Sequence, residues 1–155
     1  MPTLHLICGM PGTGKSTLAA KLEREHQALR LTPDDWMAAL IGGDGRDETM
    51  RTRIEAVQFA VALRALELGL DVVLDNGFWS RRERDEYRAR AAAVGAGTRL
   101  YYLDIPKDEA KRRLALRNRN LPPNTFPVTA EDLDGWWDYL ETPTPDEPGL
   151  IRITS

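Results

Sequence analysis

Short apolar runs alternate along this chain with longer segments in which apolar residues recur at helical spacing. The runs Leu4–Cys8, Val72–Leu74 and Leu100–Leu103 are nearly continuous, which is typical of strands covered on both faces of a parallel sheet. Since helical segments lie between the runs, the pattern predicts βαβ crossovers and an α/β fold. We expect strands at Thr3–Cys8, Leu29–Leu31, Asp71–Asn76, Arg99–Asp104 and Leu150–Ile153.

One long helix is predicted between the second and third strands, with Gly69 as its stop signal. Its apolar residues form a wide stripe, so we expect this helix to be largely buried. The stripe consists of Ile54, Val57, Phe59, Val61, Leu63, Ala65, Leu66 and Leu68.

Capping residues indicate where other helices begin. Ser80 precedes Glu83 by three positions, and Thr129 precedes Asp132 in the same way, which is the spacing of a capping box. The run Thr32–Asp35 predicts a further start, with its threonine as N-cap and a proline in the first turn.

A glycine-rich run, Gly9-Met10-Pro11-Gly12-Thr13-Gly14-Lys15-Ser16, directly follows the first predicted strand. Its spacing, G-x-x-x-x-G-K-S between a strand and a helix, predicts a P-loop whose backbone N–H groups surround phosphates. Lys15 is expected to reach the β- and γ-phosphates, and the Ser16 hydroxyl to bind Mg²⁺. We therefore predict ATP or GTP binding with Mg²⁺, through Gly9, Pro11, Gly12, Thr13, Gly14, Lys15, Ser16 and Thr17.

Two acids, Asp34 and Asp35, follow the second predicted strand. Ligands bind at the carboxyl ends of parallel strands, so Asp34 is a candidate to accept the proton of a substrate hydroxyl during phosphoryl transfer. Asp35 has a structural explanation as the third residue of its helix, and it is also a candidate substrate contact. Trp36, next to it, is a candidate wall residue for an acceptor molecule.

The third predicted strand ends in Asp75, followed by Asn76, Gly77, Phe78 and Trp79. An acid that ends an apolar strand is typical of the Walker B position, close to Mg²⁺. The alternative is a plain turn at Asn76 with Asp75 as its cap. Phe78 and Trp79 could line an acceptor site together with Trp36 or could simply cover the core, and Asn76 is a candidate substrate contact.

Charge is unevenly distributed near the end of the chain. Residues 107–119 carry six basic side chains, whereas residues 131–147 carry seven acids and no base. Arginines on a lid can close on phosphates and neutralise developing charge, and a solvated helix is the alternative. The candidates are Arg113, Arg117 and Arg119, on a lid around residues 107–127. The mixed run at residues 81–90 is interpreted as a solvated helix.

Bulk composition narrows the possible functions. With 155 residues, the sequence predicts a single domain over residues 1–155. One cysteine permits no internal disulfide, and a net charge of −3 disfavours a long nucleic acid as partner. No signal-peptide pattern and no apolar segment of roughly 20 residues is present, so we expect a soluble cytoplasmic protein, with its oligomeric state open.

The P-loop, the Asp34 motif, the Asp75-Asn76 pair and the arginine helix occur in this order over nearly the whole chain. This arrangement resembles the small P-loop kinases related to polynucleotide kinase, chloramphenicol phosphotransferase and zeta toxins. The resemblance implies a three-layer α/β/α sandwich with a five-stranded parallel sheet, order 2-3-1-4-5, and a helical lid. It also implies transfer of the γ-phosphate of ATP to a hydroxyl, with Asp34 as the activating acid.

Met37 departs from the family pattern, because polynucleotide kinases carry an arginine at the matching position. The leading hypothesis is therefore an ATP- and Mg²⁺-dependent kinase of a small molecule such as an antibiotic, nucleoside or sugar derivative. A polynucleotide 5′-hydroxyl kinase is the second hypothesis. The third is a nucleotide-binding regulatory NTPase without an acceptor.

Overall fold

A five-stranded parallel sheet forms the centre of the computed structural model, which describes all residues from Met1 to Ser155. The predicted order 2-3-1-4-5 is confirmed, and no strand end differs from its prediction by more than two residues. Across the sheet the strands are β2 (Leu29–Leu31), β3 (Val72–Gly77), β1 (Thr3–Cys8), β4 (Gly97–Leu103) and β5 (Leu150–Ile153).

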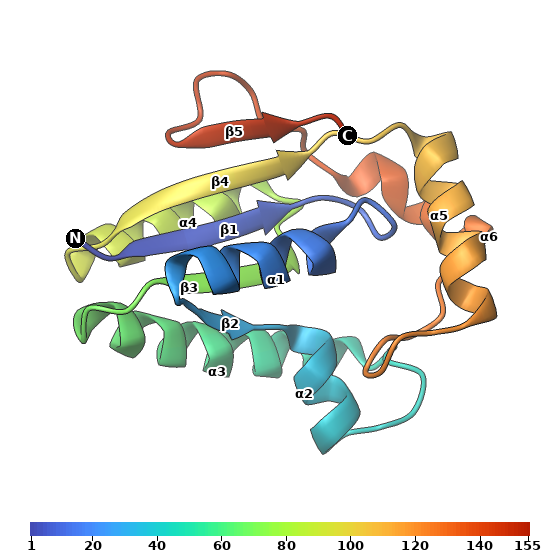
Figure 1. The fold of residues 1–155 in the computed structure, drawn as a ribbon, viewed down its shortest axis with the longest axis horizontal. Coiled ribbons are helices and arrows are strands. Elements are labelled where there is room, and N and C mark those ends of the chain that lie inside the picture. Colours follow the sequence, from blue (N-terminus) through green and yellow to red (C-terminus); the bar gives the residue numbers. More distant parts are fainter.

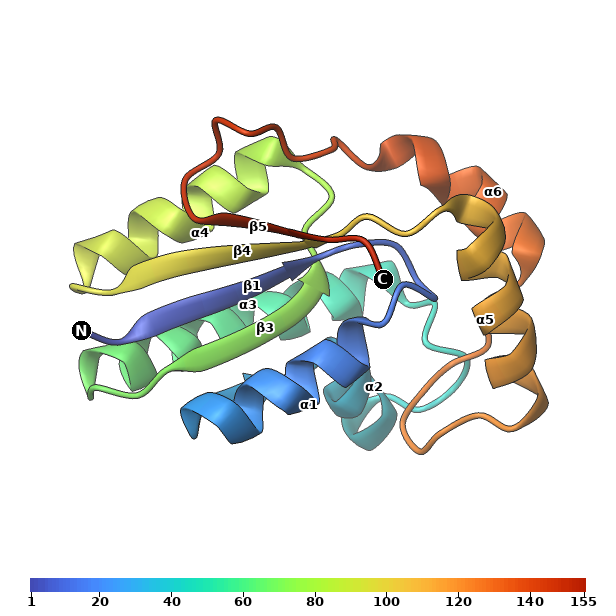
Figure 2. The ribbon, with the colours of Figure 1, turned by 45° about the horizontal axis from the view of Figure 1, so that its top comes forward.

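Helices surround the sheet and confirm the predicted three-layer α/β/α architecture (Figures 1 and 2). They are α1 (Lys15–His26), α2 (Pro33–Leu40), α3 (Glu48–Glu67), α4 (Arg81–Ala93), α5 (Lys107–Arg119) and α6 (Ala130–Trp136), followed by a 3₁₀ turn at Trp137–Tyr139. The strands all point toward the end of the sheet where α5 and α6 lie (Figure 1). None of the helices has the length and apolar character that a membrane span requires.

Alternate residues of β1 enter two different cores, because successive side chains of a strand point to opposite faces. Leu4, Leu6 and Cys8 pack with residues of α3 and α4 on one face of the sheet. Ile7 packs on the other face with Ala19 and Leu22 of α1. Burial of β1 on both sides explains why its sequence is an almost continuous apolar run.

Helix α3 is less buried than the sequence predicts. Val57 is 54% exposed and Leu68 is 64% exposed, and Val61 is exposed as well. These three side chains lie outside the face of the helix that packs on the main core. The buried face consists of Ile54, Gln58, Phe59, Ala62, Ala65 and Leu66.

Helix α4 also departs from the prediction, because the expectation of a solvated helix over residues 81–90 is wrong at Arg84. This side chain is 1% exposed and donates two hydrogen bonds to the Glu147 carboxylate, at 2.8 and 3.0 Å. It also donates to the carbonyl oxygens of Phe78 and Glu141, both at 2.8 Å. Arg84 thus joins α4, the loop after β3 and the segment before β5.

A small apolar cluster holds α5 and α6 against the carboxyl end of the sheet. It contains Met10, Ala110, Leu114 and Leu133. At Gly12 (φ +83°), an added Cβ would lie 2.6 Å from the carbonyl oxygen of Ala110. Only glycine fits this contact, so the glycine-rich loop and α5 pack directly on one another.

Candidate active site

A cavity of about 1400 Å³ opens where the carboxyl ends of β1, β2 and β3 meet. Pockets that hold a single drug-sized ligand measure roughly 300–1,000 Å³, so this cavity has room for two molecules side by side. It brings together candidate residues from four separate segments. Those that line it are Pro11, Gly12, Gly14, Lys15, Ser16, Thr17, Asp34, Asp35, Asp75, Asn76, Phe78, Trp79, Arg113 and Arg117.

The glycine-rich loop forms one wall of the cavity. Gly14 has φ +98°, a conformation that glycine adopts readily, and Lys15 begins α1 directly after it. The positive end of the helix dipole therefore points into the cavity, as it does in anion sites. Gly9 and Thr13 do not line the cavity. Both are buried, and the Thr13 hydroxyl donates to the Met10 carbonyl oxygen at 2.6 Å.

Lys15 lies at the centre of the charged groups in the cavity. Its Nζ donates to the carbonyl oxygen of Gly9 at 3.2 Å. Burial lowers the pKa of Lys15, and the negative charges of Asp75 and Asp34 act in the opposite direction. A phosphate bound here would bring negative charge and oxygens that accept hydrogen bonds, and both would interact favourably with the Lys15 ammonium group.

Asp75 provides a buried carboxylate with one free oxygen. The side chain is 6% exposed, and its Oδ2 accepts a hydrogen bond from Thr32 Oγ1 at 3.2 Å. Its Oδ1 is buried without a hydrogen-bond partner. Burial raises the pKa of Asp75 to about 6, although Lys15 acts against this. An unpaired carboxylate oxygen and the Ser16 hydroxyl in the same cavity suit Mg²⁺, which prefers oxygen ligands.

Thr32 has a different role from the predicted one. It occupies the N-cap position of α2, but its side chain makes no capping hydrogen bond. Its hydroxyl instead accepts from Arg30 Nη1 at 2.9 Å and donates to Asp75. Arg30 also contacts Asp35 Oδ2 at 3.5 Å. The expected side-chain cap from Thr32 is therefore replaced by a polar chain that runs from Asp35 to Asp75.

Asp34 points into the cavity from the first turn of α2. Its Oδ1 accepts a hydrogen bond from Nη2 of Arg51, on α3, at 2.7 Å. Arg51 also donates to the carbonyl oxygen of Gly45 at 3.1 Å. Sequence reasoning missed Arg51, and its position in the first turn of a helix gave no sign that it reaches Asp34.

The aromatic wall differs in part from the prediction. Phe78 and Trp79 line the cavity, and Trp79 Nε1 donates to the carbonyl oxygen of Gly9 at 3.2 Å. Trp36 does not line it. This side chain packs against the main core and borders a separate shallow groove with Ala39 and Leu40. Three aromatic residues that were not predicted line the cavity instead: Phe126, Trp136 and Tyr139.

Helix α5 places two of the three candidate arginines at the cavity. Arg113 Nη1 donates to the carbonyl oxygen of Thr13 at 3.5 Å, beside the glycine-rich loop. Arg117 Nη2 donates to the Phe126 carbonyl oxygen at 3.4 Å, and its Nε is buried without a partner. Burial lowers the pKa of Arg117, and the charge of Asp34 opposes this. Arg119 is exposed and lies outside the cavity, so its predicted role is not supported by its position.

Two loops meet across the mouth of the cavity. At Gly45, an added Cβ would lie 2.5 Å from the ring of Phe126, so the loop before α3 touches the loop after α5. Arg46 reinforces this contact with two hydrogen bonds to the Asp132 carboxylate, at 3.2 and 2.5 Å. These contacts tie the loop before α3 to the loop after α5, which is part of the predicted lid around residues 107–127, and to α6.

Comparisons with known proteins agree with this architecture. A family model described as an AAA domain matches residues 4–143. No curated protein matches the sequence.

Among solved structures, similar folds include a gluconokinase from Sinorhizobium meliloti 1021, at 17% identity and a TM-score of 0.67, over 99% of this chain and 82% of that one. The Mycobacterium tuberculosis APS kinase CysC, in complex with AMPPNP and APS, shares 20% identity at a TM-score of 0.66, over 99% and 88%. A chain of the Pnkp1/Rnl/Hen1 RNA repair complex shares 22% identity at a TM-score of 0.75, over 90% and 44%. The small P-loop kinase resemblance agrees with these neighbours.

Proposed function

Because this chain belongs to the AAA domain family, we propose that it is an ATP- and Mg²⁺-dependent kinase that phosphorylates a hydroxyl of a small molecule. One observation carries the proposal: a single cavity joins a glycine-rich phosphate cradle to a carboxylate that can accept a proton. A bare nucleotide-binding module needs only the first of these parts. The fold shared with the gluconokinase and with the APS kinase supports the same class of reaction.

The donor half of the cavity would hold ATP. Backbone N–H groups from Gly12 to Ser16 and the N-terminus of α1 suit the phosphates, and Lys15 would contact the β- and γ-phosphates. Ser16 and Asp75 would hold Mg²⁺, which, when bound, would neutralise part of the negative charge on the phosphate oxygens. Arg113 and Arg117 would add positive charge on the opposite side of the γ-phosphate.

The acceptor half would hold the substrate hydroxyl against Asp34. As the acceptor oxygen forms its bond to the γ-phosphorus, the bond from that phosphorus to the β–γ bridging oxygen breaks, and ADP leaves. Asp34 receives the proton of the hydroxyl, so the acceptor leaves as a phosphate ester. Asp34 is suited to this role because only one of its oxygens is occupied, by Arg51.

The charges of the acceptor half favour a small acceptor over a polynucleotide. Arg46 is paired with Asp132, and Arg51 with Asp34, so neither is free to bind a chain of phosphates. Glu55 and Glu83 line the same cavity and supply no positive charge, and burial raises the pKa of both, that of Glu55 to about 7. Phosphate contacts dominate the binding of nucleic acids, and this surface offers few of them.

A polynucleotide 5′-hydroxyl kinase remains the second candidate, because aromatic side chains that line the cavity can stack on bases. Phe126, Trp136 and Tyr139 are such side chains, and the fold is shared with a chain of an RNA repair complex. A regulatory NTPase without an acceptor is the third candidate. One experiment separates all three.

The experiment presents γ-labelled ATP and Mg²⁺ together with panels of sugars, nucleosides, aminoglycosides and 5′-hydroxyl oligonucleotides. The proposal predicts label transfer to a small-molecule hydroxyl, and no transfer by the Lys15→Ala variant. Lys21→Ala, which alters an exposed lysine of the same helix, serves as the matched control. Transfer to oligonucleotides alone would support the second candidate. ATP hydrolysis that no compound stimulates would support the third.

A further inference from the structure

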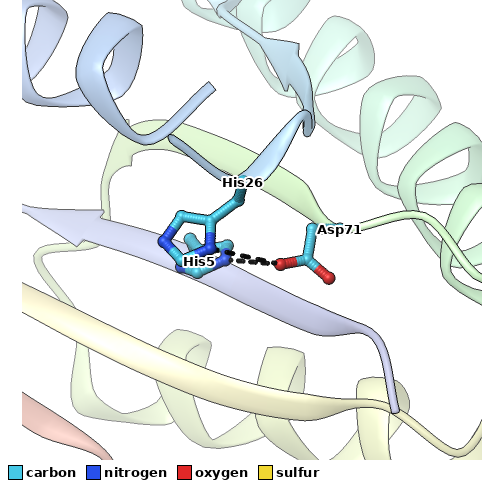
Figure 3. Close-up of side chains that lie close together, drawn as sticks. All are labelled: His5, His26 and Asp71. Atoms are coloured by element: carbon cyan, nitrogen blue, oxygen red, sulfur yellow. Dashed lines mark hydrogen bonds and ion pairs between the residues drawn. The ribbon is translucent and has the colours of Figure 1, made fainter. Parts of the chain in front are cut away.

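A second cluster of ligand-type side chains lies at the opposite end of the sheet from the cavity. It consists of His5 of β1, His26 at the end of α1 and Asp71, directly before β3 (Figure 3). The strands β1 and β3 are parallel and α1 runs back from the glycine-rich loop. The cluster therefore lies toward the amino ends of the strands, whereas the phosphate cradle lies at their carboxyl ends.

The three side chains converge on one oxygen atom. His5 Nε2 lies 3.1 Å from Asp71 Oδ2, and His26 Nδ1 lies 3.9 Å from the same oxygen. All three ligand atoms lie within 4.8 Å of one another. Around a tetrahedral Zn²⁺ with bonds of about 2.0–2.2 Å, ligand atoms are separated by about 3.3–3.6 Å. Small rotations of the side chains would therefore bring all three within bonding distance of one ion.

The surroundings hold two of these ligands in place. The backbone N–H of Thr3 donates to Asp71 Oδ1 at 2.9 Å, which leaves Oδ2 facing the imidazoles. The Tyr101 hydroxyl lies 3.1 Å from His5 Nδ1. A hydroxyl can accept as well as donate a hydrogen bond, so the Tyr101 oxygen can accept a hydrogen bond from Nδ1–H of a neutral His5, whose Nε2 then carries the lone pair. Such outer contacts orient the ligands of metal sites.

The cluster is also accessible from solvent. His5 is buried, but the side chains of His26 and Asp71 are 30% and 22% exposed. An ion can enter from this side, and a water molecule can complete its coordination. The ligand set is two imidazoles and one carboxylate, which suits zinc and its first-row neighbours rather than Mg²⁺ or Ca²⁺.

We propose that His5, His26 and Asp71 form a binding site for one first-row transition-metal ion of the Zn²⁺ type, separate from the Mg²⁺ site proposed in the cavity. The ion would tie the end of α1 to β1 and to the start of β3. Because a folded site binds the ion and an unfolded chain does not hold these ligands together, the ion would also raise the unfolding temperature.

The chain is well suited to a clean test, because it has only two histidines and one cysteine, Cys8, which is buried on the other face of the sheet. Zn²⁺ is titrated by calorimetry into the nucleotide-free chain, with Mg²⁺ in excess to occupy carboxylate sites. We expect one Zn²⁺ per chain. Binding of Co²⁺, followed by its visible absorption, should show the same stoichiometry.

Two variants decide the assignment. His26→Ala, at a partly exposed helix end, should weaken Zn²⁺ binding by at least 100-fold, since even outer contacts of metal sites contribute about 10–100-fold. Asp71→Asn should also weaken Zn²⁺ binding, while its amide oxygen can still accept the hydrogen bond from the Thr3 N–H. A folded ligand variant is therefore available even if the other variant does not fold. Arg24→Ala, an exposed neighbour on α1, should leave binding unchanged. Absence of 1:1 binding in the unaltered chain, or unchanged binding by either ligand variant, would overturn the proposal.

Discussion

Arg51 Nη2 donates a hydrogen bond to Asp34 Oδ1 at 2.7 Å, although the two residues lie on different helices. The same guanidinium is fixed at a second point by the carbonyl oxygen of Gly45. Asp34 is therefore held by one oxygen, and its other oxygen is directed to no protein donor. This relationship gives Asp34 a defined orientation in the cavity, which a proton acceptor needs.

Asp34→Asn tests this carboxylate as the proton acceptor. The amide keeps the shape of the side chain but cannot accept the hydroxyl proton, so we expect kcat to fall by about 10²–10⁴-fold. The Kd for ATP, measured by calorimetry, should change little. Asp35→Asn is the matched control, because Asp35 contacts Arg30 instead. If Asp35→Asn shows the larger loss, the neighbouring acid has the catalytic role.

Arg51→Met tests the positioning of Asp34 by its partner. We expect a loss of up to about 10²-fold in kcat, as a misplacement of about 1 Å can cause, and partial recovery in Arg51→Lys. The pair is partly exposed, so the free energy of unfolding should change by no more than about 1 kcal/mol. Arg53→Met, on the exposed side of the same helix, should change neither quantity. If the loss of kcat in Arg51→Met is accompanied by a large loss of unfolding free energy, Arg51 has a structural role only.

The glycine-rich loop and the sheet were predictable because they depend on residues close together in the sequence. The spacing of Gly9 to Ser16 needs one strand, one loop and one helix, all within the first 26 residues. The carboxyl ends of parallel strands must share an edge, so Asp34 and Asp75 could be placed in one region before their contacts were known. The strand order itself followed from a family resemblance rather than from the apolar pattern.

Helical phase explains which of the two alternatives left open for Trp36 the structure adopts. Residues two positions apart on an α-helix point about 200° apart, at 3.6 residues per turn. Asp34 faces the cavity, so Trp36 faces away from it and packs against the core. This information was present in the sequence and argued against an acceptor wall built from Trp36.

Long-range partners explain the remaining omissions. Arg84 meets Glu147 across 63 residues, and nothing near either residue in the sequence indicates the other. A run of mixed charges is usually solvated. The burial of Arg84 could be predicted only by knowing where the segment before β5, which carries Glu147, crosses α4. Arg51 was missed for the same reason, since its partner depends on how α2 packs on α3.

Asp75→Asn should stabilise the protein at about pH 8 in the absence of Mg²⁺ and nucleotide. The pKa of Asp75 is raised by burial from 3.8 to about 6, so between these values the folded state binds more protons than the unfolded state. The free energy of unfolding therefore falls as pH rises through this window. The variant lacks this fall, so we expect its free energy of unfolding at pH 8 to be higher by up to about 3 kcal/mol. The raised pKa of Asp75 already includes the opposing attraction of Lys15.

Urea unfolding at several pH values, in EDTA, measures this gain, which should vanish near pH 4. The same variant should need more Mg²⁺ for half-maximal phosphoryl transfer, because it lacks the anionic oxygen that would face the proposed cation. Asp104→Asn, outside the cavity, is the control. A stability difference that does not depend on pH would show that it does not come from the raised pKa of Asp75.

Removing Arg84 should cause the largest loss of stability among these variants. Arg84→Met leaves the buried Glu147 without its main partner, and breaking a buried ion pair in this way costs about 3–5 kcal/mol. The double variant Arg84→Met/Glu147→Met should recover part of the loss, because no buried charge is then left unpaired. Arg82→Met, exposed on the same helix, should be close to neutral in chemical unfolding.

The same pair predicts a dependence of stability on acid. Burial would raise the pKa of Glu147, but the hydrogen bonds from Arg84 and Arg88 outweigh it and lower the pKa below 4.5. Stability from this group is therefore present above about pH 4.5 and is lost as pH falls through the lower pKa of the folded state. The stability of Glu147→Gln should fall less steeply with acid than that of the unaltered chain.

Arg84 also donates a hydrogen bond to the carbonyl oxygen of Phe78, which lines the cavity. Arg84→Met should therefore raise the KM for the acceptor more than the KM for ATP, and steady-state kinetics with each substrate varied in turn would measure both.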